Sequence, residues 1–146
     1  MAEIDSEDLS YFSAFEKITG VMPTDYINTA PLLIFLVDPS ELGRAIAKKG
    51  MNIEKLRSAF RKKVVIVGDS KDLETFVRQL FSNIAILSID SKNIMGQQAI
   101  TLTIEEKDRG IAIGKEGERI KAAKLLLEKK FNASLHLKTR RSINSY

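Results

Sequence analysis

The sequence predicts an α+β fold of two similar units, each with the element order helix, strand, strand, helix, helix, strand. One observation is an internal repeat: residues 43–50 (GRAIAKKG) return as residues 110–117 (GIAIGKEG), 67 residues further along the chain. The other is that similar apolar patterns surround both copies. The spacing pairs Lys62-Lys63 with Lys129-Lys130, so it persists over about twenty residues, as expected for repeated structural units.

The first unit is assigned from apolar periodicity and helix end signals. A helix is expected over 6–19, because Leu9, Phe12, Phe15 and Ile18 share one face and Gly20 follows the end. The elements expected after it are a short strand (25–28), a buried strand (32–37), a helix opened by Asp38 and Pro39 with Glu41 closing a capping box, a helix after Gly50, and a strand (64–67).

The second unit repeats this order. Its first helix is expected over 70–83, where apolar residues recur at helical spacing. The elements expected after it are a strand (84–89), a turn (91–96), an alternating strand (99–104), a helix capped by Thr103 and Glu106 and interrupted at 114–117, a helix (118–130), and a strand (133–138). The basic segment Lys138–Arg141 then either extends a binding surface or forms a free end.

The junction between the units is short. Only Gly68 and Asp69 separate the predicted elements, so we expect domains over 1–68 and 69–146, joined rigidly in a fixed relative orientation.

Composition narrows the class of protein. The 146 residues are 44% hydrophobic, and no apolar run is long enough to cross a bilayer, so no membrane association is expected. Residues 1–16 hold five acidic side chains and no basic one, the reverse of a secretory signal, which favours the cytoplasm. The chain has no cysteine, which excludes disulfides and thiolate chemistry.

Positive charge follows the repeat. Residues 43–63 hold eight basic side chains against Glu54 alone, and residues 110–130 hold six basic against three acidic. Basic residues clustered in this way suit a polyanion, although any single lysine is more often part of a solvated helix face.

Each repeated octapeptide places small residues and lysines between two predicted helices. The start of the following helix offers unpaired backbone N–H groups and a partial positive charge, and glycine lets a phosphate approach closely. One such loop is more often a simple helix corner, but two copies in matched settings favour phosphate binding.

These residues resemble a known family. A Gly-x-x-Gly loop between two helices, preceded by Gly-x-x-Ile and followed by an apolar helix and a strand, resembles the KH domain, which binds single-stranded nucleic acid through that loop. Residues 43–53 and 110–120 resemble the paired KH modules of NusA transcription factors, in the short archaeal form. Over nearly the whole chain, this resemblance implies tandem type II KH domains, RNA binding in transcription termination or elongation, no catalysis and no cofactor.

The resemblance also implies an RNA-binding surface built from both repeats. It comprises Gly43, Arg44, Ile46, Ala47, Lys48, Lys49, Gly50, Asn52, Ile53 and Arg57 in the first unit, and Gly110, Ile113, Gly114, Lys115, Glu116, Gly117, Arg119, Ile120, Lys121 and Lys124 in the second. An apolar groove for the bases would be lined by Ile46, Ile53 and 64–67, and by Ile113, Ile120 and Leu135, although most of these are more often core residues.

Each loop departs from the family pattern. Ala47 stands where the first glycine of the loop is expected, which is costly if that position needs a positive φ. Glu116 and Glu118 place carboxylates beside the second loop, and repulsion from a phosphate is worth about 1 kcal/mol. We therefore expect weak, salt-sensitive binding by either unit and useful affinity only from the pair.

Catalytic and metal sites have little support. His136, the one histidine, alternates with Leu135 and Leu137 in a predicted strand and is expected to face solvent. Residues 110–115 are one residue short of a P-loop, and Glu116 follows where Ser or Thr is required. The acidic cluster Glu105, Glu106 and Asp108 suits either a cation or a helix start.

Two other functions remain open at this point. One is RNA binding in ribosome or rRNA maturation. The other is an adapter whose acidic amino-terminal helix docks RNA polymerase while the basic repeat holds RNA. The expected partners are single-stranded RNA and RNA polymerase, with the chain acting as a monomer.

Overall fold

A computed structural model describes residues 6–141 of the chain. These residues form two compact units, one up to Ser70 and one from Lys71 onward. Glu3 and Asp5 of the predicted acidic amino terminus lie outside the described residues. None of the helices in the described range is long and apolar enough to cross a membrane.

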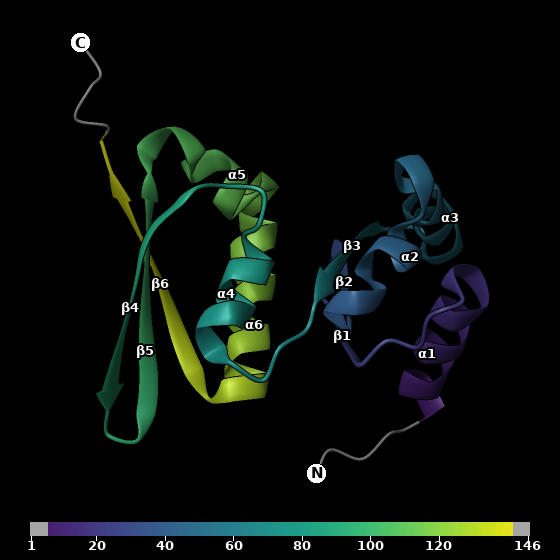
Figure 1. The fold of residues 1–146 in the computed structure, drawn as a ribbon, viewed down its shortest axis with the longest axis horizontal. Helices are drawn as coiled ribbons and strands as arrows, with labels where there is room; N and C mark the ends of the chain where they lie inside the picture. The colour runs from purple at the N-terminus through teal and green to yellow at the C-terminus, as the bar shows by residue number, and fades with distance from the viewer. Residues whose placement is uncertain (1–5, 142–146) are drawn as a thin grey trace. The chain divides into compact units, whose positions relative to one another are not determined.

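The three α-helices of the first unit lie on one face of its three-stranded sheet (Figure 1). In the sheet, β1 pairs antiparallel and β3 pairs parallel with the central β2. Its elements are α1 (Ser6–Thr19), β1 (Asp25–Asn28), β2 (Leu32–Val37), η1 (Pro39–Glu41), α2 (Leu42–Ile46), η2 (Lys48–Gly50), α3 (Met51–Phe60) and β3 (Lys63–Gly68).

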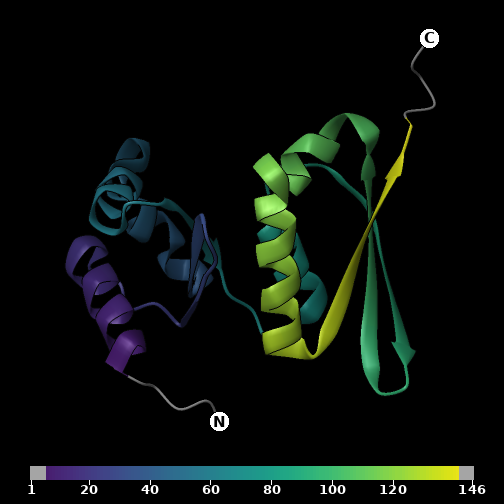
Figure 2. The same ribbon diagram turned by 180° about the vertical axis from the view of Figure 1, so that it is seen from behind.

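The second unit has the same element order and the same strand directions, with β5 in the centre of its sheet. Both views show α4 and α6 on one face of that sheet (Figures 1 and 2). Its elements are α4 (Leu73–Leu80), β4 (Ile86–Ile94), β5 (Gln97–Glu105), η3 (Glu106–Asp108), α5 (Arg109–Ile113), η4 (Lys115–Gly117), α6 (Glu118–Phe131) and β6 (Ala133–Arg140). The α+β class is confirmed.

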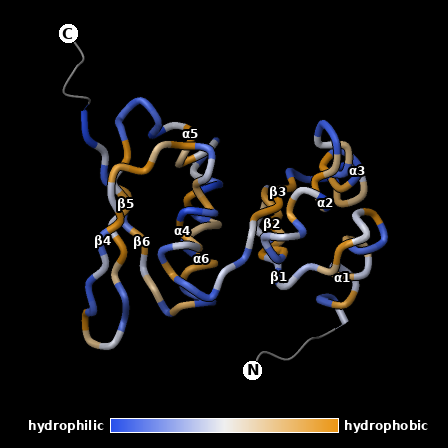
Figure 3. Tube along the Cα trace, viewed as in Figure 1, coloured by the Kyte–Doolittle hydropathy of each residue, from blue (hydrophilic) through white to orange (hydrophobic). Residues whose placement is uncertain are grey.

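The core of each unit lies between its sheet and its helices. In the first unit, Phe15 of α1 packs on Phe35 of β2 with ring centroids 4.3 Å apart, and Leu56 of α3 is fully buried in the same cluster. All six residues of β2 are buried, and Figure 3 shows β2 and β3 as strongly hydrophobic. The continuous apolar run over 32–37 was thus a correct signal for a buried strand.

The boundaries of α4 and of the following hairpin differ from the sequence prediction. The helix begins at Leu73 and not at residue 70, because Asp72 caps it by accepting a hydrogen bond from the Thr75 N–H (3.0 Å). The predicted turn over 91–96 is wrong, since β4 continues to Ile94 and only Met95 and Gly96 turn the chain, both with positive φ.

Two further predictions in the second unit are corrected. Thr103 does not cap a helix, because it is buried in β5 and paired with β4 and β6. The strand predicted to end at residue 138 continues to Arg140, and Arg141 then pairs with Glu106 at 3.3 Å. The segment Lys138–Arg141 is therefore mostly sheet and is not a free end.

The constant spacing of the repeat ends at the last turn of the third helix of each unit. The left-handed residue that follows α3 is Arg61, whereas the one that follows α6 is Asn132, 71 residues later. Helix α6 is thus one turn longer. Lys129 and Lys130 lie in this extra turn, so the sequence pairing of these lysines with Lys62 and Lys63 is not a structural equivalence.

Candidate nucleic-acid interface

The two repeated loops have the same backbone conformation. Ala47 (φ 65°, ψ 178°) corresponds to Gly114 (φ 78°, ψ 172°). The third residue of each loop is left-handed, with φ 56° at Lys49 and 55° at Glu116, and the closing glycine is left-handed as well. Each loop therefore leads its chain sharply from one helix into the next.

Alanine at position 47 occupies a conformation that is essentially restricted to glycine. The sequence prediction made its cost conditional on a positive φ, and that condition is met. The Ala47 N–H donates to the Gly43 carbonyl at 2.9 Å, just as the Gly114 N–H donates to the Gly110 carbonyl at 2.9 Å. Helix α2 therefore ends as α5 does, despite the added methyl group.

The residue that faces this position differs between the units. A Cβ added to Gly114 would lie 2.9 Å from Cγ of Arg119, which is too close without movement. The equivalent residue in the first unit is Asn52, whose buried amide donates to the Ala45 carbonyl at 2.9 Å. The shorter Asn52 side chain thus accompanies the alanine, and the longer Arg119 accompanies the glycine.

Arg119 ties the second loop to α4. Its guanidinium donates to the Leu80 carbonyl at 2.9 Å. Partial burial of the guanidinium lowers its pKa, and the nearby charge of Glu118 acts in the opposite direction. Sequence reasoning placed Arg119 at the RNA surface, but this hydrogen bond gives it a structural contact within the unit.

The loops present lysines and free backbone donors. Lys48, Lys49 and Lys115 are exposed, and none of them has an ion pair among the described residues. No hydrogen bond in the described part of the chain uses the backbone N–H groups of Lys115 or Glu116. Helices α3 and α6, of 10 and 14 residues, begin directly after these loops. This arrangement can bind an anion such as a phosphate.

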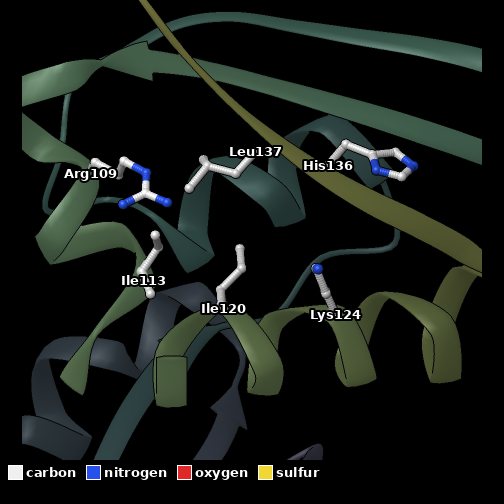
Figure 4. Close-up of a pocket in the computed structure, with 6 residues that line it drawn as sticks. All are labelled: Arg109, Ile113, Ile120, Lys124, His136 and Leu137. Atoms are coloured by element: carbon white, nitrogen blue, oxygen red, sulfur yellow. The ribbon is translucent and has the colours of Figure 1, made fainter. Parts of the chain in front are cut away.

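A groove of about 320 Å³ lies beside the second loop, between α5, α6 and the outer strand β6. Figure 4 shows Arg109 at one end, Lys124 and His136 at the other, and the three apolar side chains between them. The lining residues are Arg109, Ile113, Ile120, Lys124, His136 and Leu137.

Two of the lining residues, Ile113 and Ile120, were predicted from the sequence to line a groove, and Lys124 was predicted only as an RNA contact. Arg109 and Leu137 were not predicted, and the predicted Leu135 is not among the lining residues. Leu135 is 2% exposed and belongs to the core. His136 is exposed, as predicted, and also lines the groove. The alternation in β6 was visible in the sequence, but it does not tell which of two apolar residues two positions apart reaches the groove.

The predicted groove residues of the first unit are mostly part of its core. Val64, Ile66 and Val67 are at least 92% buried, while Ile46 and Ile53 pack partly buried against the core. The remaining predicted cations of this unit have carboxylate partners. Arg44 pairs with Glu41 at 3.2 Å and Arg57 with Glu54 at 3.6 Å.

The other predicted glycines of the two repeats are not tightly packed. A Cβ at Gly43, Gly50 or Gly110 would contact nothing within 4 Å, so packing does not require glycine at these three positions. At Gly117 it would lie 3.8 Å from Cε of Lys121, which places that exposed lysine against the second loop.

Two carboxylates of the acidic cluster near the start of α5 form ion pairs with basic side chains. Glu105 pairs with Lys107 at 3.3 Å and Glu106 with Arg141 at 3.3 Å. Within residues 6–141, no three His, Cys, Asp or Glu side chains are arranged to hold a metal ion.

Comparisons with known proteins agree with this geometry. A family model described as "KH domain" matches residues 77–144, most of the second unit. A protein of Methanococcus vannielii named "Probable transcription termination protein NusA" is 27% identical over 121 residues, 83% of this chain and 70% of its own. A protein of the same name from Thermoplasma acidophilum is 25% identical over 131 residues, 90% of this chain and 91% of its own.

The chain belongs to the short NusA-like KH proteins. A solved structure reported as "Crystal structure of APE1850" is 39% identical, with a TM-score of 0.79, and the match covers 94% of this NusA-like chain and 100% of that one. The similarity to these proteins thus extends over both units.

Proposed function

We propose that this NusA-like chain binds single-stranded RNA with both loops and acts, without catalysis, in transcription termination or elongation. The observation that carries the proposal is that two loops have the same backbone conformation. Each loop has exposed lysines, and each lies at the start of a helix. The relatives supply the second part, because their names describe proteins of transcription termination.

The loops offer a phosphate three kinds of favourable interaction. These are the free N–H groups of the loop, the partial positive charge at the helix start, and the ammonium groups of the lysines. Glu116 opposes them in the second loop, where the first loop has Lys49 at the equivalent position. We infer that the first loop supplies more of the electrostatic attraction and the second supplies the groove.

The proposal includes the first unit as a KH domain, although the family model matches only residues 77–144. Its support is the shared element order, sheet order and loop backbone. It also includes two domains over 1–68 and 69–146 held in a fixed relative orientation, because the segment between β3 and α4 is short.

The test is a charge reversal in both loops. Lys48→Asp, Lys49→Asp and Lys115→Asp together should abolish binding of a fluorescent 20-nucleotide RNA in an anisotropy titration, while the circular dichroism spectrum stays unchanged. For the unchanged protein, the logarithm of the affinity should fall linearly with the logarithm of the salt concentration.

A matched control reverses three exposed lysines elsewhere in the chain, Lys17, Lys71 and Lys92. The control has the same net charge as the loop variant but keeps the loop lysines. If the loops bind the RNA, the control should keep most of the affinity. Equal losses in both variants, or no dependence on salt, would exclude loop-specific binding.

The remaining predictions about partners belong to the same proposal. We propose that the protein is a monomer in the cytoplasm and that it contacts RNA polymerase through the acidic first turn of α1, Glu7 and Asp8. An adapter of this kind should still bind purified polymerase after both loops are reversed. Loss of polymerase binding in the loop variant would place the polymerase contact at the loops, and the acidic helix would then have no such role.

A further inference from the structure

The groove of the second unit has three side chains with nitrogen donors that have no partner within residues 6–141. Arg109, Lys124 and His136 have no hydrogen bond or ion pair with other described residues. Other arginines of the same unit do have partners, since Arg78 pairs with Glu74 and Arg119 donates to Leu80. The groove therefore contains donors that remain available to a ligand.

The space between these donors is apolar and small. Ile113, Ile120 and Leu137 separate Arg109 from Lys124 and His136, and none of the described residues that line the groove is a carboxylate (Figure 4). Its volume of about 320 Å³ is at the lower end of the range for small-molecule sites, which suits one nucleobase with its ribose.

The chemistry of the donors distinguishes between bases. Arginine and lysine donate hydrogen bonds and cannot accept them. Guanine and uracil present carbonyl oxygens, O6 and O4, where adenine and cytosine present amino groups, N6 and N4. An amino group directed at Arg109 or Lys124 finds no acceptor and remains unpaired, which is unfavourable when the group is desolvated.

We propose that the groove of the second unit selects nucleobases with a carbonyl group at this edge, guanine and uracil, over those with an amino group, adenine and cytosine. This selectivity rests on the proposed RNA binding. Arg109 and Lys124 determine it, because a neutral His136 offers one donor and one acceptor and so discriminates less.

The first unit does not have this arrangement. Leu42 stands at the position of Arg109, and Val65 of β3 stands at the position of His136. The residue equivalent to Lys124 is Arg57, which pairs with Glu54 at 3.6 Å. The base selectivity therefore belongs to the second unit alone.

Recognition by the backbone would give a different result. Strand β6 is the outer strand of its sheet, and one edge of it pairs with none of the strands in the described part of the chain. A free strand edge has both N–H donors and carbonyl acceptors, so it would bind the edge of adenine at least as well as that of a carbonyl base. Discrimination against amino bases is thus the property that side-chain recognition predicts and backbone recognition does not.

The test uses RNA in which one base changes. A cytidine 12-mer with a single central inosine, adenosine or uridine is titrated with the whole protein at fixed salt, and affinity is measured by fluorescence anisotropy. Inosine and adenosine differ mainly by O6 in place of the N6 amino group. The inosine and uridine RNAs should bind about tenfold more tightly than the adenosine RNA and the unsubstituted cytidine RNA.

The substitution Arg109→Gln tests the residue assignment. Glutamine both donates and accepts, and it pairs well with adenine, so the ratio of inosine to adenosine affinity should fall to about one or below. Arg78→Gln removes the same charge from an exposed position outside the groove and should leave the ratio unchanged. An unchanged ratio in the Arg109→Gln variant overturns the role of Arg109.

The outcomes separate this proposal from the general one. If no RNA binds, or if binding survives reversal of the loop lysines, the proposed function fails. If RNA binds through the loops but adenosine equals or exceeds inosine, the proposed function stands and the base selectivity is overturned. The base series needs no altered protein, so it decides the question even if an Arg109 variant does not fold.

Discussion

Ala47 and Gly114 adopt the same backbone conformation with different consequences for stability. A non-glycine residue in this region of φ and ψ costs about 1–3 kcal/mol. In the second loop the glycine avoids this cost and leaves room for Arg119, which an added Cβ would approach to 2.9 Å. In the first loop Asn52 replaces the arginine. The residue at the Arg119 position thus differs between the units together with the loop residue.

Replacing Ala47 with glycine should stabilise the protein. Removing the Cβ relieves the unfavourable backbone conformation, and the gain outweighs the extra flexibility that glycine gives the unfolded chain. We expect the free energy of unfolding to rise by about 1 kcal/mol in urea denaturation. Ala59→Gly, at an exposed position within α3, is the control and should lower it by about 1 kcal/mol. A loss of stability in Ala47→Gly would show that the backbone at residue 47 is relaxed.

The reverse change at Gly114 should destabilise the second unit by about 2 kcal/mol, because the new Cβ meets both an unfavourable φ and the side chain of Arg119. Arg119→Ala removes the Cγ atom that this Cβ would meet, and it also loses the hydrogen bond to the Leu80 carbonyl. If the clash with Arg119 is real, the double variant should be more stable than the sum of the single losses predicts. A double-mutant cycle measured by urea denaturation gives this coupling, and strict additivity would contradict the contact.

At the scale of helices and strands, the apolar pattern of the sequence determined which element bounds could be predicted. Helix α1 and strand β2 have the predicted bounds, since each has an uninterrupted apolar signal and a clear end. The outer half of the β4–β5 hairpin was missed because residues 90–97 are all exposed. A strand that buries neither face leaves no period-two pattern in the sequence. Met95 also hides the turn, since asparagine or glycine is the usual residue at such a positive φ.

The extra turn of α6 explains why the spacing of the repeat does not extend to the last strand of each unit. Phe131, in this turn, packs against Phe76 of α4 with ring centroids 5.5 Å apart. The longer helix changes the spacing between the repeats from 67 to 71 residues before the last strand begins. A constant spacing applied to the sequence therefore cannot place His136 and Leu137 beside the correct residues of β3.

The cap of α4 leads to a prediction about pH. Hydrogen bonds from Thr75, through its side chain and its backbone N–H, lower the pKa of Asp72 below its ordinary 3.8. A carboxylate with a lowered pKa in the folded state stabilises the fold above its unfolded pKa, and this contribution is lost as the pH falls through the folded value.

Asp72→Ala should therefore lower the Tm at pH 7, and the difference from the unchanged protein should shrink well below pH 3.8. This Tm difference is measured by thermal unfolding at several pH values, monitored by circular dichroism. Asp90→Ala, at an exposed position in β4, serves as the control with the same change of charge. A Tm difference that stays constant with pH would mean that the Asp72 charge does not stabilise the helix.

At the scale of the whole molecule, the two units share a backbone plan and differ in side chains. The first loop has two adjacent lysines and an unfavourable alanine, while the second has two glycines, one lysine and Glu116. The free donors of the groove occur only in the second unit among the described residues. Neither unit combines a strongly basic loop with a donor-lined groove, so under the proposed RNA binding the two units would complement each other on a single strand.

This division predicts how affinity depends on RNA length. A KH loop contacts about four nucleotides, so a 6-nucleotide RNA occupies one unit, whereas a 20-nucleotide RNA can occupy both. The second contact then forms at a high effective concentration, and the long RNA should bind about a hundredfold more tightly than the short one. Lys115→Asp should remove most of this advantage while leaving the short RNA bound to the first loop. Anisotropy titrations with both RNAs measure the effect, and equal affinities for the short and long RNA in the unchanged protein would mean that the units bind separately.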